Sequence, residues 1–339
     1  FALCDRAERV DAAALLPAGA GAWAGPARPL VEPSAYRAAA ERVLEHIHAG
    51  DVYQANLTFQ AEVRVAGSPL ALYAALRARA RAGHGALVFT GEHWILSLSP
   101  ELFFTLRDGR VESRPMKGTA RAGADESALR DDPKQRAENL MIVDLIRNDL
   151  SRVSTPGTVK VPDLFAVERY PTVLQMTSTV TAEVEPGRDA IDLVEAIFPC
   201  GSITGAPKIR AMEIVHKLER GPRGVYCGAI GRVAPDGEAA FNVAIRTLVL
   251  RAGDSVAGLG LGSGIVADSR AGEEWRECLA KGAFVSDGGS GFDLIETMRF
   301  DPIDGMADLE RHLGRMKASA DALGFSFDRH DARNELQAA

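Results

Sequence analysis

Apolar residues recur along the chain with two different periods, and each period predicts one kind of element. Val43 and Leu44 lie three or four residues from Ile47, and Val43 lies four residues after Ala39, which predicts a helix over residues 34–49. The same spacing predicts helices at residues 68–82, 126–153, 189–197, 207–218 and 272–284. Residues 12–33 are instead rich in Ala, Gly and Pro, which is typical of a loop between elements.

Strands are predicted where β-type runs lie between turn residues. One run covers residues 52–65, several short ones fall within 86–116, and three longer ones are VYCGAIGRVA, EAAFNVAIRTLVLRA and SVAGLGLGSGIVA. The segment RDGR at 107–110 predicts a hairpin turn of the Asp-Gly kind. Because clusters of strands are separated by clusters of helices, we expect an α+β fold with antiparallel sheets covered by helices.

Composition narrows the class of protein. The 339 residues are 46% hydrophobic and 25% charged, as in an ordinary globular protein, and the formal net charge is −7. No basic stripe with interleaved aromatic residues is present, so we expect no nucleic-acid partner. An acidic protein that binds an anion needs local cations, a metal or helix-end amides to do so.

Cysteines and hydropathy bear on the compartment. The four cysteines lie far apart without a CxxC pair, so we expect free thiols in a reducing cytoplasm. No run approaches 18 apolar residues and no export leader opens the chain, so we expect neither a membrane span nor secretion. The chain starts at Phe1 and stops inside a helical pattern, which indicates a fragment of a longer protein.

Two glycine-rich segments could hold an anion. Gly201-Ser202-Ile203-Thr204-Gly205-Ala206-Pro207-Lys208 leads into a helix, whose first amides are free to bind negative charge. A Gly-rich turn with a capping Thr explains the same residues. Gly260-Leu261-Gly262-Ser263-Gly264 offers a second set of unencumbered amides, and a bulge or tight bend in a sheet explains it equally well.

Carboxylates at helical spacing could bind a metal. Glu274 and Glu277 share one face of their helix, and Glu138 lies on the helix of residues 126–153. Oxygen ligands from two helices, completed by water and a substrate carboxylate, are how proteins hold Mg²⁺. Solvated helix faces are the alternative.

Three further residues could carry chemistry. Lys117 lies between Pro115 and Gly118 at a turn, where a lysine of lowered pKa could act as a nucleophile, although most turn lysines lie at the surface. Glu101 ends a strand after Ser99-Pro100. Arg246 interrupts the apolar strand FNVAIRTLVL, so it needs an acidic partner, either a substrate carboxylate or an internal Asp or Glu.

Together these segments resemble the chorismate-binding enzyme family, which includes anthranilate synthase component I. The motifs follow the family's order over residues 34–284: GDVYQANLT, SPELFF, RPMKGT, AENLMIVDLIRNDL, FPCGSITGAPK, VYCGAIG, FNVAIRTL and GSGIVADS followed by EEWRECLAK. The resemblance implies an anthranilate synthase component I-like fold, a two-sheet antiparallel β-sandwich covered by helices. It also implies chorismate as the substrate and Mg²⁺ as the cofactor.

Site residues carry over from the resemblance by position. Glu138 and Glu277 match Mg²⁺ ligands, with Glu274 assisting through water. Substrate binding is implied for Gly201, Ser202, Thr204, Lys208, Tyr226, Arg246, Ser263 and Gly264. Glu101 matches the acid that protonates the departing C4 hydroxyl.

Lys117 separates members of the family. Anthranilate synthases typically carry Ala at this position (PIAGT), whereas aminodeoxychorismate synthases carry Lys (PIKGT), and this chain has PMKGT. The resemblance therefore implies amination of chorismate at C4 through a covalent lysine intermediate, in p-aminobenzoate and folate biosynthesis. Gln175 stands where anthranilate synthases have a His linked to pyruvate elimination, which favours the same interpretation. An anthranilate synthase component I and a non-catalytic chorismate-binding fragment are the alternatives.

The tail resembles the start of aminodeoxychorismate lyase, a pyridoxal-phosphate enzyme whose cofactor lysine would lie beyond this chain. Pyridoxal phosphate is therefore expected only for a full lyase domain. The expected division is a remnant of the N-terminal β-region and linker, the catalytic domain, a GGSG linker and the truncated lyase-like start, at residues 1–33, 34–287, 288–291 and 292–339. The family also implies a separate glutamine amidotransferase that supplies ammonia.

Overall fold

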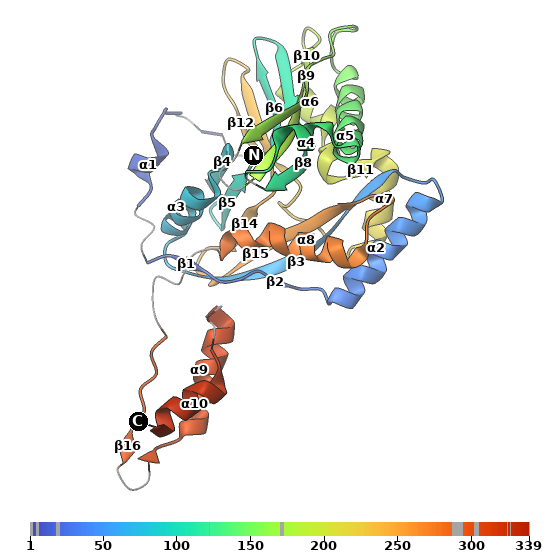
Figure 1. The fold of residues 1–339 in the computed structure, drawn as a ribbon. Coiled ribbons are helices and arrows are strands. Elements are labelled where there is room, and N and C mark those ends of the chain that lie inside the picture. The colour runs from blue at the N-terminus through green and yellow to red at the C-terminus, as the bar shows by residue number, and fades with distance from the viewer. Residues whose placement is uncertain are drawn as a thin grey trace.

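The fold of the chain was analysed in a computed structural model, which describes residues 3–4, 7–17, 21–121, 123–169, 173–286, 294–301, 305–323, 325 and 327–338. Two antiparallel sheets form its centre and helices cover them (Figure 1), which confirms the α+β prediction. The first sheet contains β1 (Trp23–Ala24), β3 (Gln54–Ala66), β15 (Val256–Ile265), β14 (Thr247–Arg251), β5 (His93–Ser99) and β4 (His84–Phe89) in that order. Two short strands, β2 (Arg28–Pro29) and β11 (Gly205–Ala206), also pair with β3.

The second sheet is built from hairpins. Its order is β12 (Ala229–Val233), β13 (Ala239–Val243), β6 (Leu102–Arg107), β7 (Arg110–Arg114), β10 (Val173–Glu183) and β8 (Met116–Arg121), with β9 (Lys160–Arg169) also paired to β10. Asp108 and Gly109 join β6 to β7 with φ angles of 49° and 73°. Positive φ at both central positions is the geometry that favours Asp-Gly in two-residue hairpins, so the predicted turn is confirmed.

Each sheet packs against its own helices. The first is covered by α2 (Pro33–His48), α3 (Pro69–Ala80), α7 (Lys208–Leu218) and α8 (Ala271–Gly282), and Phe59 of β3 stacks on Trp275 of α8 at 5.0 Å. The second packs against α5 (Pro133–Ser151) and α6 (Ala190–Ile197) through buried residues such as Phe104, Ile142 and Leu193. Full burial of one such side chain stabilises the fold by about 1.5–3 kcal/mol. The remaining short helices are α1 (Ala12–Leu15), α4 (Glu126–Asp131) and the 3-10 turns Gly201–Ile203 and Ala283–Val285.

The predicted local structure of residues 126–153 and 12–33 was wrong. The helix expected over residues 126–153 is divided into α4 and α5 at Asp132, which is extended with ψ 116° and caps α5 through Gln135 N. A residue before proline avoids the helical region, and Pro133 follows here. Residues 12–33, expected to be a loop, contain α1, β1 and β2, because the long edge of β3 offers backbone partners to the last two.

A bent ribbon of two chain segments connects the sheets. β5 and β14 are neighbours in the first sheet, and their continuations β6 and β13 are neighbours in the second. At the crossing, Leu98 N donates to Arg246 O at 3.0 Å and Val243 N donates to Glu101 O at 3.1 Å. The run 238–252 is therefore two strands rather than the single strand predicted, because Arg246 turns the chain with a φ of 48°.

The tail forms a small unit of its own. It contains the short strands β16 (Phe300–Asp301) and β17 (Gly305–Met306) and the helices α9 (Leu309–Leu323) and α10 (Arg329–Ala338). The predicted linker at 288–291 lies outside the described residues. Within the described ranges, every helix is too short or too polar to cross a membrane.

Candidate active site

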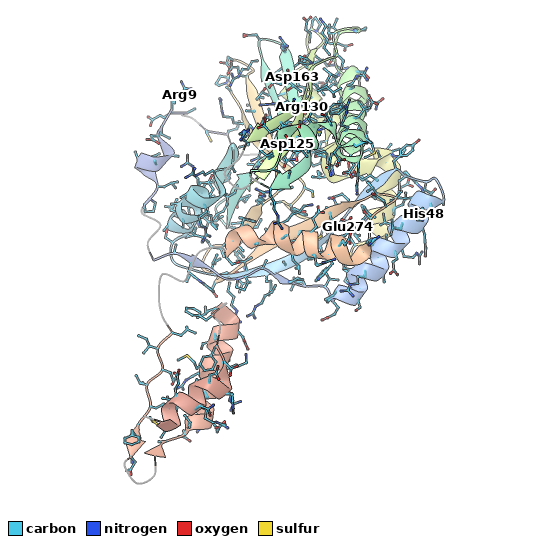
Figure 2. All side chains as sticks on the ribbon, in the orientation of Figure 1. Arg9, His48, Asp125, Arg130, Asp163 and Glu274 are labelled. Carbon is cyan, nitrogen blue, oxygen red and sulfur yellow. The ribbon has the colours of Figure 1, made fainter. Side chains whose placement is uncertain are left out.

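A cavity of about 640 Å³ lies where the ribbon crosses between the sheets. Strands β3, β8 and β15, helices α5 and α8, and both crossing segments contribute to its wall. Most of the predicted site residues meet there, namely Glu101, Lys117, Glu138, Ser202, Tyr226, Arg246, Gly264, Glu274 and Glu277. Figure 2 labels Glu274 on α8. Residues far apart in the sequence thus form one concave site.

Glycines on β15 make room for the side chains of this site. Gly260, Gly262 and Gly264 alternate along the strand and all line the cavity. A Cβ on Gly260 would lie 2.0 Å from the Tyr226 ring, and one on Gly264 would lie 3.2 Å from both Lys117 Nζ and Gln54 Nε2. β15 pairs with β3 in unbroken register from Val256 to Ile265, so the bulge alternative for this segment is wrong. The glycines provide space rather than a bend.

The side chain of Ser263 lies on the other face of β15. Its hydroxyl oxygen is 2.9 Å from the hydroxyl of Tyr36 on α2, and both are buried. Successive side chains of a strand point to opposite faces, so Gly264 on the cavity requires Ser263 to face the helices. The structure therefore does not bring the Ser263 side chain to the site.

The glycine-rich loop at 201–208 contributes only part of its predicted residues. Ser202 lines the cavity, whereas Gly201 lies against Leu145 of α5, where a Cβ would meet Leu145 Cδ2 at 2.3 Å. Thr204 is buried and its Oγ1 donates to Cys200 O at 3.0 Å. Gly201 and Thr204 thus shape the loop from behind, and the capping-turn alternative describes their side chains better than ligand binding does.

Lys208 is also absent from the cavity wall. Its ammonium forms a partly buried ion pair with Asp149 at the end of α5 and donates to Ile197 O at 3.0 Å. The lysine therefore joins the start of α7 to the ends of α5 and α6. The structure gives its side chain a role in holding these helices together, because the ammonium is already paired.

Lys117 stands in the cavity within strand β8, so the turn predicted for it is wrong: Met116–Arg121 is extended and pairs with β10. Gly118 has a φ of 94°, and its carbonyl accepts a hydrogen bond of 2.8 Å from Gln175 Nε2. Burial lowers the pKa of Lys117, and so does the positive charge of Lys281. The nearby carboxyl groups have the opposite, weaker effect on this pKa. A larger fraction of the side chain is then a neutral amine, which is the nucleophilic form.

Glu101 is a buried carboxyl at the first crossing. Glu101 is only 5% exposed, and its Oε1 has no hydrogen-bond partner among the described residues. Burial raises the pKa of Glu101 to about 7, against the opposite effects of a hydrogen bond with Ser202 and the charge of Lys117. This carboxyl can therefore hold a proton near neutral pH and give it up.

The acidic residues on α5 and α8 fit a magnesium site with few protein ligands. Glu138 of α5 and Glu277 of α8 face the same cavity, and their charges interact. Glu277 is paired with Lys281 at 2.7 Å, and Glu274 accepts a hydrogen bond of 2.5 Å from Ser269. No group of three metal-binding side chains stands ready in the part of the chain that the structure describes. Mg²⁺ often takes one or two carboxylates and completes its shell with water and substrate, and these donors suit that mode.

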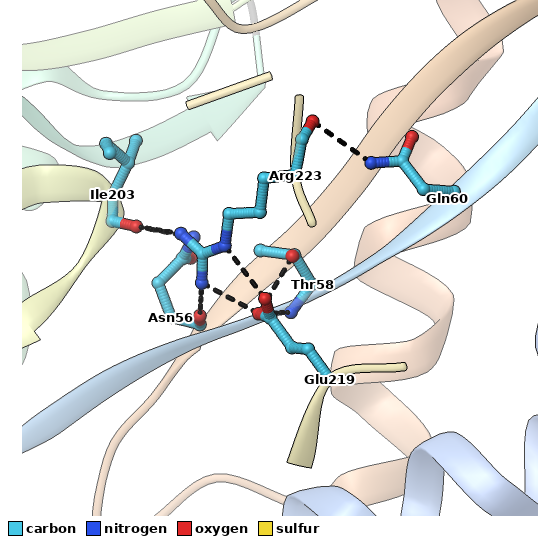
Figure 3. Close-up of polar contacts among 6 residues, drawn as sticks. All are labelled: Asn56, Thr58, Gln60, Ile203, Glu219 and Arg223. Atoms are coloured by element: carbon cyan, nitrogen blue, oxygen red, sulfur yellow. Dashed lines mark hydrogen bonds and ion pairs between the residues drawn. The ribbon is translucent and has the colours of Figure 1, made fainter. Parts of the chain in front are cut away.

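A partly buried ion pair holds the loop that carries Tyr226 (Figure 3). Arg223 pairs with Glu219 at 2.7 Å and donates to Asn56 O at 2.7 Å and to Ile203 O at 2.8 Å. Glu219 in turn accepts hydrogen bonds from the backbone N and the Oγ1 of Thr58. Strand β3, the 201–208 loop and the 219–228 loop, which all contribute to the cavity, are thereby fastened together.

Sequence reasoning missed several residues of the wall. Asn56 of β3, Lys134 and Gln135 of α5, and Lys281 of α8 line the cavity. A signal existed for the first, because Gln54, Asn56, Thr58 and Gln60 are polar at every second position of β3, so one face of this strand is polar although most of its first half is buried. The helix residues carried no comparable signal, since exposed lysines and glutamines occur on most helices.

Comparison with known proteins agrees with this architecture. The sequence profile described as chorismate binding enzyme matches residues 2–287, and the chain belongs to that family. The aminodeoxychorismate synthase component 1 of Klebsiella aerogenes is 43% identical over 247 residues, covering 71% of this chain and 54% of the relative. The 2-amino-4-deoxychorismate synthase of Streptomyces globisporus is 42% identical over 255 residues, covering 74% and 51%. The chain thus spans about half the length of the curated relatives that it matches.

Overall identity does not separate the activities within the family. The anthranilate synthase component 1 of Streptomyces coelicolor is also 43% identical, covering 71% of this chain and 48% of the relative. The solved anthranilate synthase component I of Streptococcus pneumoniae superposes with a TM-score of 0.71 at 33% identity, covering 76% of this chain and 59% of that one. These matches establish the predicted two-sheet fold, and the choice of reaction depends on individual site residues.

Proposed function

We propose that this chain forms the chorismate site of an aminodeoxychorismate synthase component I and adds ammonia at C4 of chorismate. One observation carries the proposal: Lys117, an amine whose pKa is lowered by burial, lines the cavity together with Glu101, an acid whose pKa is raised. The family resemblance implies alanine at this position in anthranilate synthases, so anthranilate chemistry would need no nucleophilic side chain there. A nucleophile and an acid in one cavity support displacement of a hydroxyl group.

The proposed reaction has two displacements. The neutral amine of Lys117 attacks C2 of the ring, the two ring double bonds shift, and the C4–O bond breaks. Glu101 gives its proton to the departing hydroxyl, which leaves as water. Ammonia then adds at C4, the double bonds shift back, and the C2–N bond returns its electron pair to Lys117. Glu101 recovers a proton from the new ammonium group at C4.

Substrate binding is assigned by chemistry and position. Arg246 and the neutral hydroxyl of Tyr226, whose pKa burial holds well above its usual value, would bind the enolpyruvyl carboxylate, and Ser202 lies beside Glu101. Glu138 and Glu277 would hold Mg²⁺, with Glu274 acting through water. When bound, Mg²⁺ supplies positive charge that neutralises the ring carboxylate. The backbone amides at Ser263 and Gly264 stay a proposed part of the substrate site.

Product analysis tests the function directly. Chorismate, Mg²⁺ and an ammonium salt should yield aminodeoxychorismate by mass spectrometry without release of pyruvate, and purified aminodeoxychorismate lyase should convert the product to p-aminobenzoate. Chelation of Mg²⁺ with EDTA should stop turnover. Fluorescent anthranilate accompanied by pyruvate would establish the alternative reaction instead, and Mg²⁺-dependent binding of chorismate without turnover would indicate a non-catalytic module.

The source of ammonia is proposed to be a separate subunit. The relatives named component 1 imply a second component, and we infer that this is a glutamine amidotransferase. The chain has no glutaminase Cys-His pattern. The lyase-like nature of residues 292–339 also stays a proposal, since the family match ends at residue 287.

The pH dependence of the reaction should report on Glu101. Its pKa of about 7 lies above the ordinary value of 4.5, so the acid is fully protonated below about pH 6 and loses its proton as the pH rises through 7. We expect kcat/KM to fall on this alkaline limb. Glu101→Gln should lose about 10²–10⁴-fold in rate and should also lose the limb, because the amide keeps its hydrogen atoms at every pH. A steady-state pH profile from 5 to 9 measures both; an unchanged limb in the variant would assign the titration to another group.

A further inference from the structure

Gln54 is a buried polar side chain with unmet hydrogen-bonding capacity beside the proposed nucleophile. The residue is 0% exposed, and among the described residues neither Oε1 nor Nε2 of its carboxamide has a hydrogen-bond partner. Leaving a buried donor or acceptor unpaired costs about 1–3 kcal/mol. A hydrogen bond that forms when a neighbouring group reorients during the reaction would offset this cost.

The backbone holds Gln54 firmly in place. It is the first residue of β3, and β11 pairs with it through the register Ala206–Gln54. Gly205 approaches so closely that a Cβ there would lie 2.2 Å from Gln54 O. The preceding amide, Tyr53 N, donates to Ala206 O at 2.7 Å. The carboxamide therefore starts from a well-defined position.

The side chain extends toward Lys117. Gln54 lies on the same face of β3 as Asn56, which lines the cavity, because the two are separated by one residue. Gln54 Nε2 and Lys117 Nζ each lie 3.2 Å from the point that a Cβ on Gly264 would occupy. The two ends converge on the same small volume above β15, which only a glycine leaves open.

The chemistry of the pair suits a nucleophilic amine. A neutral amine has two N–H donors and one lone pair, and the lone pair attacks only when it points at carbon. The charged groups that act most strongly on the pKa of Lys117 are Lys281 and the carboxyl groups of Glu138, Glu101 and Glu277. A carboxylate favours the ammonium form, which has no lone pair, whereas a carboxamide oxygen accepts an N–H without adding charge.

We propose that Gln54 is a positioning residue for Lys117, and that its carboxamide oxygen accepts one N–H of the neutral amine and turns the lone pair toward C2 of the substrate. The carboxamide can present either terminal atom to the amine by rotation about its last bond. The inference rests on the proposed role of Lys117 and adds the residue that orients it.

Two near-isosteric variants test this role. Gln54→Met removes the hydrogen bond and keeps the length of the side chain, and Gln54→Glu keeps an acceptor but adds charge. Both should lower kcat by about 10²-fold, the loss expected from a misplaced reacting group, while the Kd for chorismate measured by calorimetry stays within about twofold. Trapping of the lysine adduct in single-turnover mass spectrometry should slow by the same factor.

A double-mutant cycle separates positioning from folding. In a Lys117→Ala background, Gln54→Met should cause no further loss of the residual rate, because its effect acts through the amine. Equal losses in both backgrounds, wild-type kcat in either Gln54 variant, or a change confined to KM would overturn the inference. Where Gln54→Met fails to fold, Gln54→Glu decides. Absence of C4-aminated product from the unmutated chain would instead count against the proposed function itself.

Discussion

Replacing Lys117 with alanine is expected to reduce C4 amination to a small residual rate while chorismate still binds. The variant removes the only group assigned to attack C2 and leaves Glu101, Tyr226 and Arg246 in the cavity wall. Loss of a covalent nucleophile lowers kcat by at least about 10³-fold in enzymes where it has been removed. The measurement is initial rate by product mass spectrometry, with the chorismate Kd from calorimetry beside it.

A matched control distinguishes the nucleophile from a general effect of lost charge. Lys217 is an exposed lysine of α7 that takes no part in the cavity wall, so Lys217→Ala should keep the wild-type rate. Lys117→Arg should be as inactive as the alanine variant, because a guanidinium keeps the charge but is not nucleophilic. Turnover of Lys117→Ala at the wild-type rate would remove the covalent step from the mechanism, although the family assignment would stand.

Adding one methyl group at Gly260 should disable the site by displacing Tyr226. A Cβ there would lie 2.0 Å from Tyr226 Cγ and 2.2 Å from Cδ1, distances at which the ring must move. We expect Gly260→Ala to raise the Kd for chorismate by about 10²-fold, as expected when a buried contact to the substrate's carboxylate is lost. The overpacked site should also lower the free energy of unfolding by about 1–3 kcal/mol.

Gly258 provides the control on the same strand. It lies two residues before Gly260, and a Cβ there would approach only Val249 O, at 3.8 Å. Gly258→Ala should therefore bind chorismate normally and unfold at an unchanged or slightly higher urea concentration, since alanine reduces the entropy of the unfolded chain. Normal binding by both variants would mean that Tyr226 does not contact the substrate.

The family assignment and the choice of reaction depend on different evidence. The profile match over residues 2–287 and the solved fold at a TM-score of 0.71 establish the family. Relatives of both activities are equally identical to this chain at 43%, so overall identity does not choose between the two reactions. The proposed C4 amination depends on Lys117, because a single nucleophilic amine changes which reaction the same cavity can catalyse.

Local features of the sequence determined the elements and the inventory of reactive groups. Helical spacing predicted α2, α6 and α7 within about two residues, and Asp108-Gly109 predicted the β6–β7 hairpin. These features depend on residues close together in the chain, so they can be inferred without the fold. The ordered motifs likewise identified Glu101, Lys117, Glu138 and Glu277, and all of these residues meet in the cavity.

Only the tertiary structure decided which side chains face the site. Strand register determines the face of every residue, and a shift of one position exchanges the two faces. The pairing of β15 with β3 therefore puts Gly264 on the cavity and Ser263 on the helices, although the two are adjacent in one motif. Lys208 lies outside the cavity because it pairs with Asp149, which is distant in sequence.

The same principle explains what sequence reasoning could not reach. Arg246 appeared to interrupt a single strand, and the fold instead places it where the chain crosses from one sheet to the other. Gln54 appeared to be one polar residue of a strand, and the close approach of Gly264 brings it beside Lys117. The sequence by itself determined the family, the elements and the reactive residue types, since these are local or ordered along the chain. The meeting of these groups in one cavity was decided by contacts between distant strands, which no local pattern contains.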